Sequence, residues 1–274
     1  MSRINRTTVG DVEIIALTDG ETQFGAELFP GTEEAKIDAL LAEAKAEAID
    51  TNFNAFVVKS GGDTMLVDAG PRDLFGPTCG YLGDALEEAG IGPDEITHLY
   101  FTHLHPDHIA GALTKEGQPV FEKAQMLVSE ADHKFWSSQV FTDETLAQWQ
   151  QLAQATLAAY APRTEQIKDG DTLVRDVTAL NLPGHTPGHM GFRADSGSDS
   201  FAHVGDIAHA QVLQFADPEI GIAFDIDMDQ ARATRKRTLD MVTTDGMKLS
   251  GGHMLRPNIG RLERAGKGYI FKED

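Results

Sequence analysis

The sequence predicts an α/β fold in which two mixed β-sheets pack together and helices cover their outer faces. Short segments of β pattern recur along the chain, and helical patterns lie between them. Such an alternation is typical of layered sheets flanked by helices. The 274 residues, 41% of them hydrophobic, can also bury a sizeable core. No repeat or low-complexity linker interrupts the pattern, so we expect residues 1–274 to form one domain.

The expected strands are short runs rich in β-branched and aromatic residues, bounded by turn-forming residues. In chain order they are Val9–Leu17, Asn54–Lys59, Thr64–Val67, His98–Thr102, Gln125–Ser129, Leu173–Leu182, His189–Arg193 and Phe201–Val204. The polar run Asp195–Ser200 follows one of these strands and precedes another, and it is expected to form the turn of a hairpin rather than a domain boundary.

Residues Thr32–Ala48 have the period of an acidic amphipathic helix, with Ile37 and Leu40 on its apolar face. One interpretation is a surface helix packed on the core. The other is a lid or dimer arm, because aromatic residues such as Phe24 and Phe29 stand in the loop before it. We therefore regard about residues 1–50 as an N-terminal extension of the domain.

A second helical stretch lies within Ser129–Tyr160. Its apolar stripe includes Trp149 and is expected to pack in the core. The aromatic residues that precede this stripe are candidates for lining a substrate cleft, although most buried aromatics simply pack. They are Phe135, Trp136 and Phe141.

The densest set of chemically active side chains follows the apolar run Ile96–Phe101. His103, His105, Asp107 and His108 stand within six residues. Imidazole and carboxylate groups favour a borderline cation such as zinc, and ligands this close in one loop can face two adjacent ions. An H-x-H-x-D-H pattern is expected by chance in roughly one such chain in a thousand. The segment is therefore predicted to form half of a two-metal site.

Three later segments supply further ligands for such a site. They carry His185, Asp206 and His253, each at the end of a short apolar run. A glycine near each residue lets the backbone turn and present the side chain at the edge of a sheet. Taken together and in this order, the segments complete a set of seven ligands.

These motifs closely resemble those of the metallo-β-lactamase superfamily, over the stretch from about Asn52 to His253. The resemblance implies a single αββα sandwich. It also implies two metal ions that share the seven ligands. His103, His105 and His185 would hold one ion, Asp107, His108 and His253 would hold the other, and Asp206 would bridge them.

Two cations that share a carboxylate can also share a water, and their joint charge lowers its pKa enough to give hydroxide near neutral pH. That hydroxide would be the nucleophile, and Asp107 and His209 are the residues we assign to the catalytic group. Two Zn²⁺ per chain are expected, with Fe, Mn or Co as possible substitutes. Asp68 matches a carboxylate near the metal site that would orient a ligand imidazole, unless it only caps a turn. His189 is expected to make a structural hydrogen bond.

Differences between this sequence and particular branches of the superfamily narrow the choice of branch. His105 stands where diiron flavoproteins carry Glu, and Asp206 stands where typical zinc β-lactamases lack a bridging carboxylate. The region after Asp206 most closely resembles the lactonase and organophosphate-hydrolase branch. Many acyl-homoserine lactonases place a Tyr three residues after the bridging Asp, and here that position is His209. Its imidazole either contacts the substrate oxygen or the leaving alkoxide, or has a structural role.

The sequence thus predicts a dinuclear zinc hydrolase of a lactone or another small carboxylic or phosphoric ester. One alternative is a glutathione-thioester hydrolase of the glyoxalase II type. Another is a mononuclear iron persulfide dioxygenase, and a third is a metal-stabilised binding protein, which would need fewer ligands. Two zincs per chain would support hydrolysis, whereas one iron would point to the dioxygenase.

Charge and composition restrict partners and location. A net charge of −20 and a pI near 4.7 disfavour nucleic acid, because binding a polyanion needs basic surface. No apolar run suits a membrane helix, Met1–Thr7 lacks the apolar core of a secretion signal, and the single Cys79 cannot form an internal disulfide. We expect a cytoplasmic homodimer. Four basic residues are expected to form a solvated helix face, namely Arg232, Arg235, Lys236 and Arg237.

Overall fold

The computed structural model describes residues 2–256 and 258–273, which form two mixed seven-stranded sheets. The first sheet has the order β1-β2-β3-β4-β5-β6-β7. Its strands are β1 (Ile4–Val9), β2 (Val12–Phe24), β3 (Ile49–Ser60), β4 (Asp63–Val67), β5 (His98–Tyr100), β6 (Gln125–Ser129) and β7 (Thr164–Ile167). Strands β1 to β4 pair antiparallel, whereas β4 to β7 pair parallel.

The second sheet has the order β14-β13-β12-β11-β10-β9-β8, and only β11 and β12 pair parallel. Its strands are β8 (Thr172–Val174), β9 (Val177–Asn181), β10 (Met190–Ser196), β11 (Asp199–His203), β12 (Lys248–Ser250), β13 (Gly260–Ala265) and β14 (Gly268–Glu273). The turn predicted within Asp195–Ser200 is confirmed, because Ser196 pairs with Asp199 where β10 meets β11.

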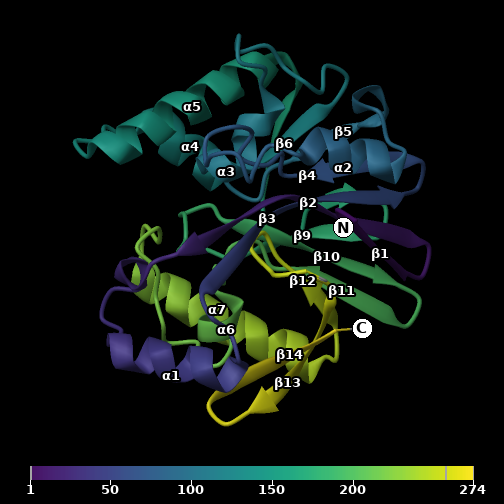
Figure 1. Cartoon of the computed structure of the whole chain (residues 1–274). Helices are drawn as coiled ribbons and strands as arrows, with labels where there is room; N and C mark the ends of the chain where they lie inside the picture. Colours follow the sequence, from purple (N-terminus) through teal and green to yellow (C-terminus); the bar gives the residue numbers. More distant parts are fainter. Residues whose placement is uncertain (1, 257, 274) are drawn as a thin grey trace.

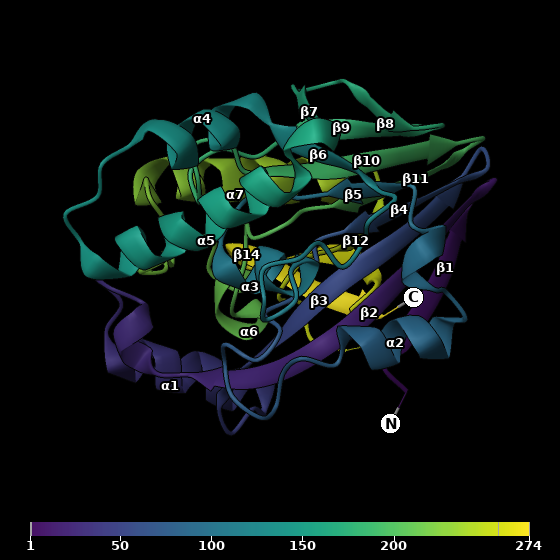
Figure 2. The same cartoon turned by 90° about the horizontal axis from the view of Figure 1, so that it is seen from above.

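Helices cover both outer faces of the paired sheets (Figure 1). They are α1 (Glu34–Ala44), α2 (Leu82–Ala89), α3 (Pro106–Ile109), α4 (Glu130–Ser138), α5 (Glu144–Tyr160), α6 (Gln211–Gln214) and α7 (Met228–Thr244). Over the first sheet, α4 and α5 lie at one end and α2 at the other (Figure 2). The second sheet is covered by α7. The predicted sandwich of two mixed sheets flanked by helices is confirmed.

Side-chain alternation along β2 explains why the first sheet is buried on both faces. Ile14 belongs to the cluster between the two sheets, together with Phe192 and Phe201 of the second sheet. Its neighbour Ile15 belongs to the cluster beneath the helices, which includes Trp136. Successive strand residues point to opposite faces, so a strand with an apolar layer on both sides has a nearly continuous hydrophobic sequence.

Two predicted strands are each a pair of strands joined by a tight turn. The expected strand Val9–Leu17 contains the turn at Gly10 between β1 and β2, where the backbone has φ +53°. The expected strand Leu173–Leu182 contains the turn at Asp176, with φ +61°, between β8 and β9. The prediction of one continuous strand was wrong at both places, because the apolar residues on either side of each turn make one unbroken β pattern.

Strands β7, β12, β13 and β14 were not predicted. Strand β12 has only three residues, and β13 carries charged side chains with weak β propensity. Strands β1 and β2 belong to the first sheet. The part of the expected N-terminal extension that they occupy is therefore integral to the sandwich.

Helix α1 is shorter than the predicted helix, because Lys45 adopts a left-handed conformation that ends it. Figures 1 and 2 show α1 beside α6. Ile37 of α1 is buried in a cluster with Phe29, Leu213 and Ile222. The apolar face of α1 is therefore packed within the chain, as the interpretation of a surface helix expected. Among the described residues, no helix has the length and apolar character needed to cross a bilayer.

Candidate metal centre and active site

The predicted ligands lie in loops and in the short helix α3, and these segments meet at one edge of the sandwich. His103 and the residues after it follow β5, whereas Asp206 and His253 follow β11 and β12. Because β11 and β12 run parallel, their carboxyl ends bring Asp206 and His253 together. His185 lies in the loop between β9 and β10, which closes the other side of the site.

All seven predicted ligands come together, in two groups whose ligand atoms lie within 4.8 Å of one another. The three-histidine group comprises His103, His105 and His185, and the second group comprises Asp107, His108, Asp206 and His253. Asp206 lies between the groups. Its Oδ2 is 2.9 Å from Nε2 of His253 and 3.1 Å from Nε2 of His108. The same oxygen is 3.5 Å from Nε2 of His185 and 3.7 Å from Nε2 of His103.

The donor atoms fit a pair of cations. Within the described part of the chain, Nε2 of His103, His105 and His185 and Oδ1 of Asp206 are buried and have no hydrogen-bond partner. Buried polar atoms are normally satisfied, because leaving them unpaired costs free energy. Imidazole nitrogens and carboxylate oxygens aimed at a common point are the ligand chemistry of zinc and similar ions.

The opposite ring nitrogens of the ligands are held by acceptors. Nδ1 of His108 donates to Oδ2 of Asp68 at 2.8 Å, and Nδ1 of His253 donates to the carbonyl of Asn52 at 2.9 Å. Nδ1 of His185 bonds to Oδ1 of Asp225 at 2.9 Å. A proton on Nδ1 leaves the lone pair of Nε2 free for a metal and fixes the plane of the ring.

Asp68 lies where the resemblance expected a carboxylate beside the ligands. Its backbone has φ +59°, a conformation that is costly for a residue other than glycine. Thr102 holds the carboxylate in place, because its N–H donates to Oδ1 at 2.9 Å and its hydroxyl donates to Oδ2 at 2.8 Å. Asp68 therefore connects the end of β4 to the first ligand loop.

Burial and neighbouring charges shift the pKa values of the histidines in the two groups in opposite directions. Burial lowers the pKa values of His103, His105 and His185 well below the usual value, so these rings are neutral and can act as ligands. Burial also lowers the pKa of His253, but the carboxylates of Asp206 and Asp107 outweigh it and raise that pKa to about 10. The two carboxylates thus stabilise positive charge at this end of the site.

His189 has a structural place behind the site. Its Nδ1 donates to the carbonyl of Leu182 at 2.8 Å, and its Nε2 accepts the backbone N–H of Asp206 at 2.9 Å. Gly205 has φ +51°, and a Cβ added there would lie 2.2 Å from the His189 ring. Only glycine fits at this position, which lets the backbone approach the ring and direct the Asp206 carboxylate into the site.

Two residues near the site differ from the sequence prediction. Asp225 was not predicted to contact a ligand, and Arg235 was predicted on a solvated helix face. Arg235 is fully buried, so the prediction of a solvated face was wrong for this residue. Its guanidinium donates to the carbonyls of Ile207, Pro218 and Ile220 and lies 3.9 Å from Oδ2 of Asp225. Burial lowers its pKa to about 10, which still leaves it charged near neutral pH. Arg235 therefore anchors the long loop that carries Asp206, His209 and Asp225.

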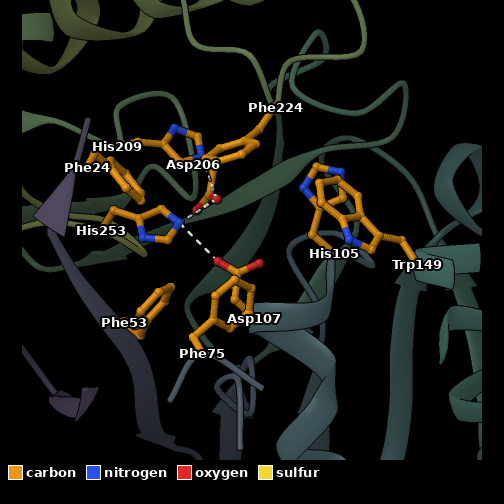
Figure 3. A pocket seen from close by; sticks show the side chains of 10 residues that line it. All are labelled: Phe24, Phe53, Phe75, His105, Asp107, Trp149, Asp206, His209, Phe224 and His253. Carbon is orange, nitrogen blue, oxygen red and sulfur yellow. Dashed lines mark hydrogen bonds and ion pairs between the residues drawn. The ribbon is translucent and has the colours of Figure 1, made fainter. Parts of the chain in front are cut away.

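An apolar pocket opens onto the ligands (Figure 3). Its cavity volume is about 50 Å³, and its walls carry five aromatic side chains. These are Phe24, Phe53, Phe75, Trp149 and Phe224. The ligand side contributes His105, Asp107, Asp206, His209 and His253. The polar groups thus gather on the ligand side of an otherwise aromatic cavity, as in many small-molecule sites.

The aromatic residues of α4, α5 and the segment between them were predicted only in part. The stripe of α5 packs against the core as expected, and so does Trp149, but Trp149 also lines the pocket, with its ring 4.8 Å from that of His105. Phe135, Trp136 and Phe141 pack against one another instead, with centroids 5.1 to 5.6 Å apart, and they do not line this pocket. Apolar period alone cannot distinguish a core face from the wall of a cavity.

Comparisons with known proteins agree with this geometry. Over its full length the chain is similar to AidC, a dizinc quorum-quenching lactonase crystallised with the product N-hexanoyl-L-homoserine, with 26% identity, a TM-score of 0.94 and 98% of that chain covered. It is also similar to the hydrolase AbOPH of the beta-lactamase superfamily, with 28% identity, a TM-score of 0.91 and coverage of 100% of this chain and 99% of that one. The uncharacterized protein YobT of Bacillus subtilis (strain 168) is 28% identical over 175 residues, which are 60% of this chain and 69% of YobT. Residues 50–253 match the sequence model of the metallo-beta-lactamase superfamily, and the chain therefore belongs to that superfamily.

Proposed function

We propose that this metal-dependent hydrolase is dinuclear and acts on a lactone or another small carboxylic or phosphoric ester. The observation that carries the proposal is the position of Asp206, whose Oδ2 faces both groups of ligands. A single carboxylate in this place suits two adjacent cations. The similarity to a dizinc lactonase and to the hydrolase AbOPH supports the same reaction class.

In this proposal the three-histidine group would hold one ion, Asp107, His108 and His253 would hold the other, and Asp206 would be shared by both. Two bound divalent ions, which we expect to be zinc, would supply Lewis acidity and a hydroxide nucleophile at neutral pH. Oδ2 of Asp107 lies 3.3 Å from Nε2 of His253 and 3.4 Å from Nε2 of His108, and Asp107 lines the pocket, so its carboxylate would lie beside a substrate bound there. Asp68 and Asp225 orient the rings of His108 and His185.

The aromatic walls indicate the kind of substrate. Phe24, Phe53 and Trp149 offer apolar surface, which favours an acyl or aryl group and excludes water from the ligand side. The described lining contains no Lys or Arg that would pair with the carboxylates of a glutathione moiety. This lining favours the lactone or simple ester over the glutathione-thioester alternative.

Metal analysis and a substrate panel test the proposal. Purified protein should hold close to two transition-metal ions per chain and lose hydrolysis on chelation. Lactones, aryl esters, phosphotriesters, thioesters and β-lactams should then be compared on the zinc-loaded protein, with lactones or simple esters preferred. A fully loaded protein with a single iron would instead support the persulfide dioxygenase. Preference for glutathione thioesters would support the glyoxalase II type.

His209 is proposed to contact the substrate oxygen or the leaving alkoxide. Its Nε2 lies 3.2 Å from Oδ2 of Asp206, and it lines the pocket. Its backbone N–H donates to Oε1 of Gln214 at 2.7 Å, which fixes the position of the residue. Within the described residues its Nδ1 is buried without a hydrogen-bond partner. The imidazole therefore keeps one ring nitrogen that no described protein group occupies.

We expect His209→Ala to lower kcat by ~10²-fold or more, because a positioned acid or oxyanion donor is lost. Metal content should not change, and His133→Ala on α4 serves as the control outside the site. His209→Tyr should shift the ratio of lactone to phosphotriester or aryl-ester activity. His209 also lies within ligand distance of His185 and Asp206, so loss of a metal ion from His209→Ala would show that it is a ligand instead.

Trp149 is expected to contribute to substrate binding more than to chemistry. Trp149→Ala should raise KM by about 10- to 100-fold, the equivalent of removing one large apolar contact, while kcat changes less. Trp149→Phe should keep most of the affinity. Metal content must be measured in both variants, because the Trp149 ring also packs on His105. An unchanged KM for every substrate in the panel would contradict this role.

A further inference from the structure

Asp132, at the start of α4, is a fully buried carboxylate that lies behind the metal site. Its Oδ1 accepts the backbone N–H of Gly188 at 2.9 Å. Its Oδ2 accepts the backbone N–H of Leu104 at 3.0 Å and the indole N–H of Trp136 at 3.3 Å. One carboxylate thus receives donors from three separate segments of the chain.

Both backbone donors belong to loops that carry ligands. Leu104 stands between His103 and His105 in the chain, and Gly188 stands three residues after His185. The first loop follows strand β5 of the first sheet, and the second precedes strand β10 of the second sheet. This carboxylate therefore ties together the two loops that hold the whole three-histidine group.

Packing around Asp132 restrains helix α4 and the two ligand loops relative to one another. Ser129 caps α4 by accepting the N–H of Asp132 at 3.0 Å. A Cβ on Gly188 would lie 2.2 Å from the Asp132 nitrogen, so the second ligand loop rests directly on the helix. The Trp136 ring packs edge-on against the ring of His105, with centroids 5.7 Å apart. The third donor to the carboxylate thus also contacts a ligand.

We propose that Asp132 is a positioning residue that holds the three-histidine group in ligating geometry by fixing the backbone of both loops. This inference rests on the proposed dinuclear site. Asp132 would not touch metal or substrate, and it acts only through the peptide groups and the indole that it accepts. The affinity of the site for a metal ion depends strongly on such supporting contacts. A ligand side chain that is held out of place must be reordered when the metal binds, and this reordering costs affinity.

Asp132→Asn is the direct test, because it keeps the volume of the side chain. An amide has only one acceptor oxygen, so its NH₂ group must face either Gly188 or the pair of donors on the other side. Titration of metal-free protein with zinc against a chromophoric chelator should show that one of two stepwise affinities falls by about 10- to 100-fold, while the other stays at the wild-type value. The rise in unfolding temperature that zinc produces should shrink accordingly.

Asp19→Asn is the matched control. Asp19 is equally buried and accepts the N–H groups of Gly80 and Leu82 at the start of α2, a segment without proposed ligands. We expect it to destabilise the metal-free protein by a similar amount, with both zinc affinities unchanged. If Asp132→Asn and Asp19→Asn lose zinc affinity equally, Asp132 contributes only to the general stability of the protein, and the proposal is overturned.

Wild-type zinc affinities in Asp132→Asn would also overturn it. Should that variant not fold, Trp136→Phe removes one of the three donors and keeps most of the ring. It is expected to weaken the same binding step several-fold, and an unchanged affinity counts against the proposal. A wild-type protein that binds fewer than two zinc ions would contradict the dinuclear site itself, so the two failures can be told apart.

Discussion

Asp206→Ala should abolish hydrolysis and lose metal more completely than replacement of His108 or His185. The carboxylate lies against Nε2 atoms of both ligand groups, and its loss leaves the charges of two adjacent ions less compensated. Loss of a hydrogen-bonded neighbour of a ligand typically costs 10- to 100-fold in affinity or activity. Removal of a ligand shared by both ions should lower kcat/KM by more than ~10³-fold.

Metal content per chain and kcat/KM should be measured on the same preparations. Asp217→Ala is a suitable control, because Asp217 is also buried but pairs with Lys36 and Lys267 outside the pocket. That variant should keep its metal ions. If Asp206→Ala holds two ions and hydrolyses at the wild-type rate, Asp206 is not the bridge.

Arg235→Met should lower the free energy of unfolding by about 3–5 kcal/mol. The change removes the donor for the carbonyls of Ile207, Pro218 and Ile220 and leaves the side chain of Asp225 buried without its nearest cation. An unpaired buried charge and unsatisfied carbonyls are each costly. Because this loop also carries Asp206 and positions Asp225 against His185, zinc affinity should fall as well.

Chemical denaturation of metal-free and zinc-loaded protein measures both effects. Arg237→Met on the exposed side of α7 is the control, and it should change stability by less than about 0.5 kcal/mol. Arg235→Lys keeps the charge but cannot reach three carbonyls in the same planar geometry, so it should recover only part of the loss. A stability of Arg235→Met equal to that of Arg237→Met would show that the loop is held by other contacts.

The seven candidate ligands, which the structure brings together, could be found from the sequence because their signal is local. His103, His105, Asp107 and His108 stand within six residues of the chain, and the three later candidates each follow a short apolar strand with a glycine beside them. This local chemistry also determined the family and its layered fold. Strands with strong β patterns were placed for the same reason, since alternation is a property of a few consecutive residues.

Tertiary structure alone decided which other residues serve the site. Arg235 has the sequence context of a solvated helix face, but the loop between β11 and α7 folds over it, and its carbonyls require a buried donor. Trp149 belongs to an apolar helix stripe that packs against the core, and only the folded structure shows that its ring also lines the pocket. Asp132 is distant in sequence from both loops whose N–H groups it accepts. The candidate ligands are thus recognisable from local spacing, whereas the contacts that support them depend on segments that meet only when the two sheets pack together.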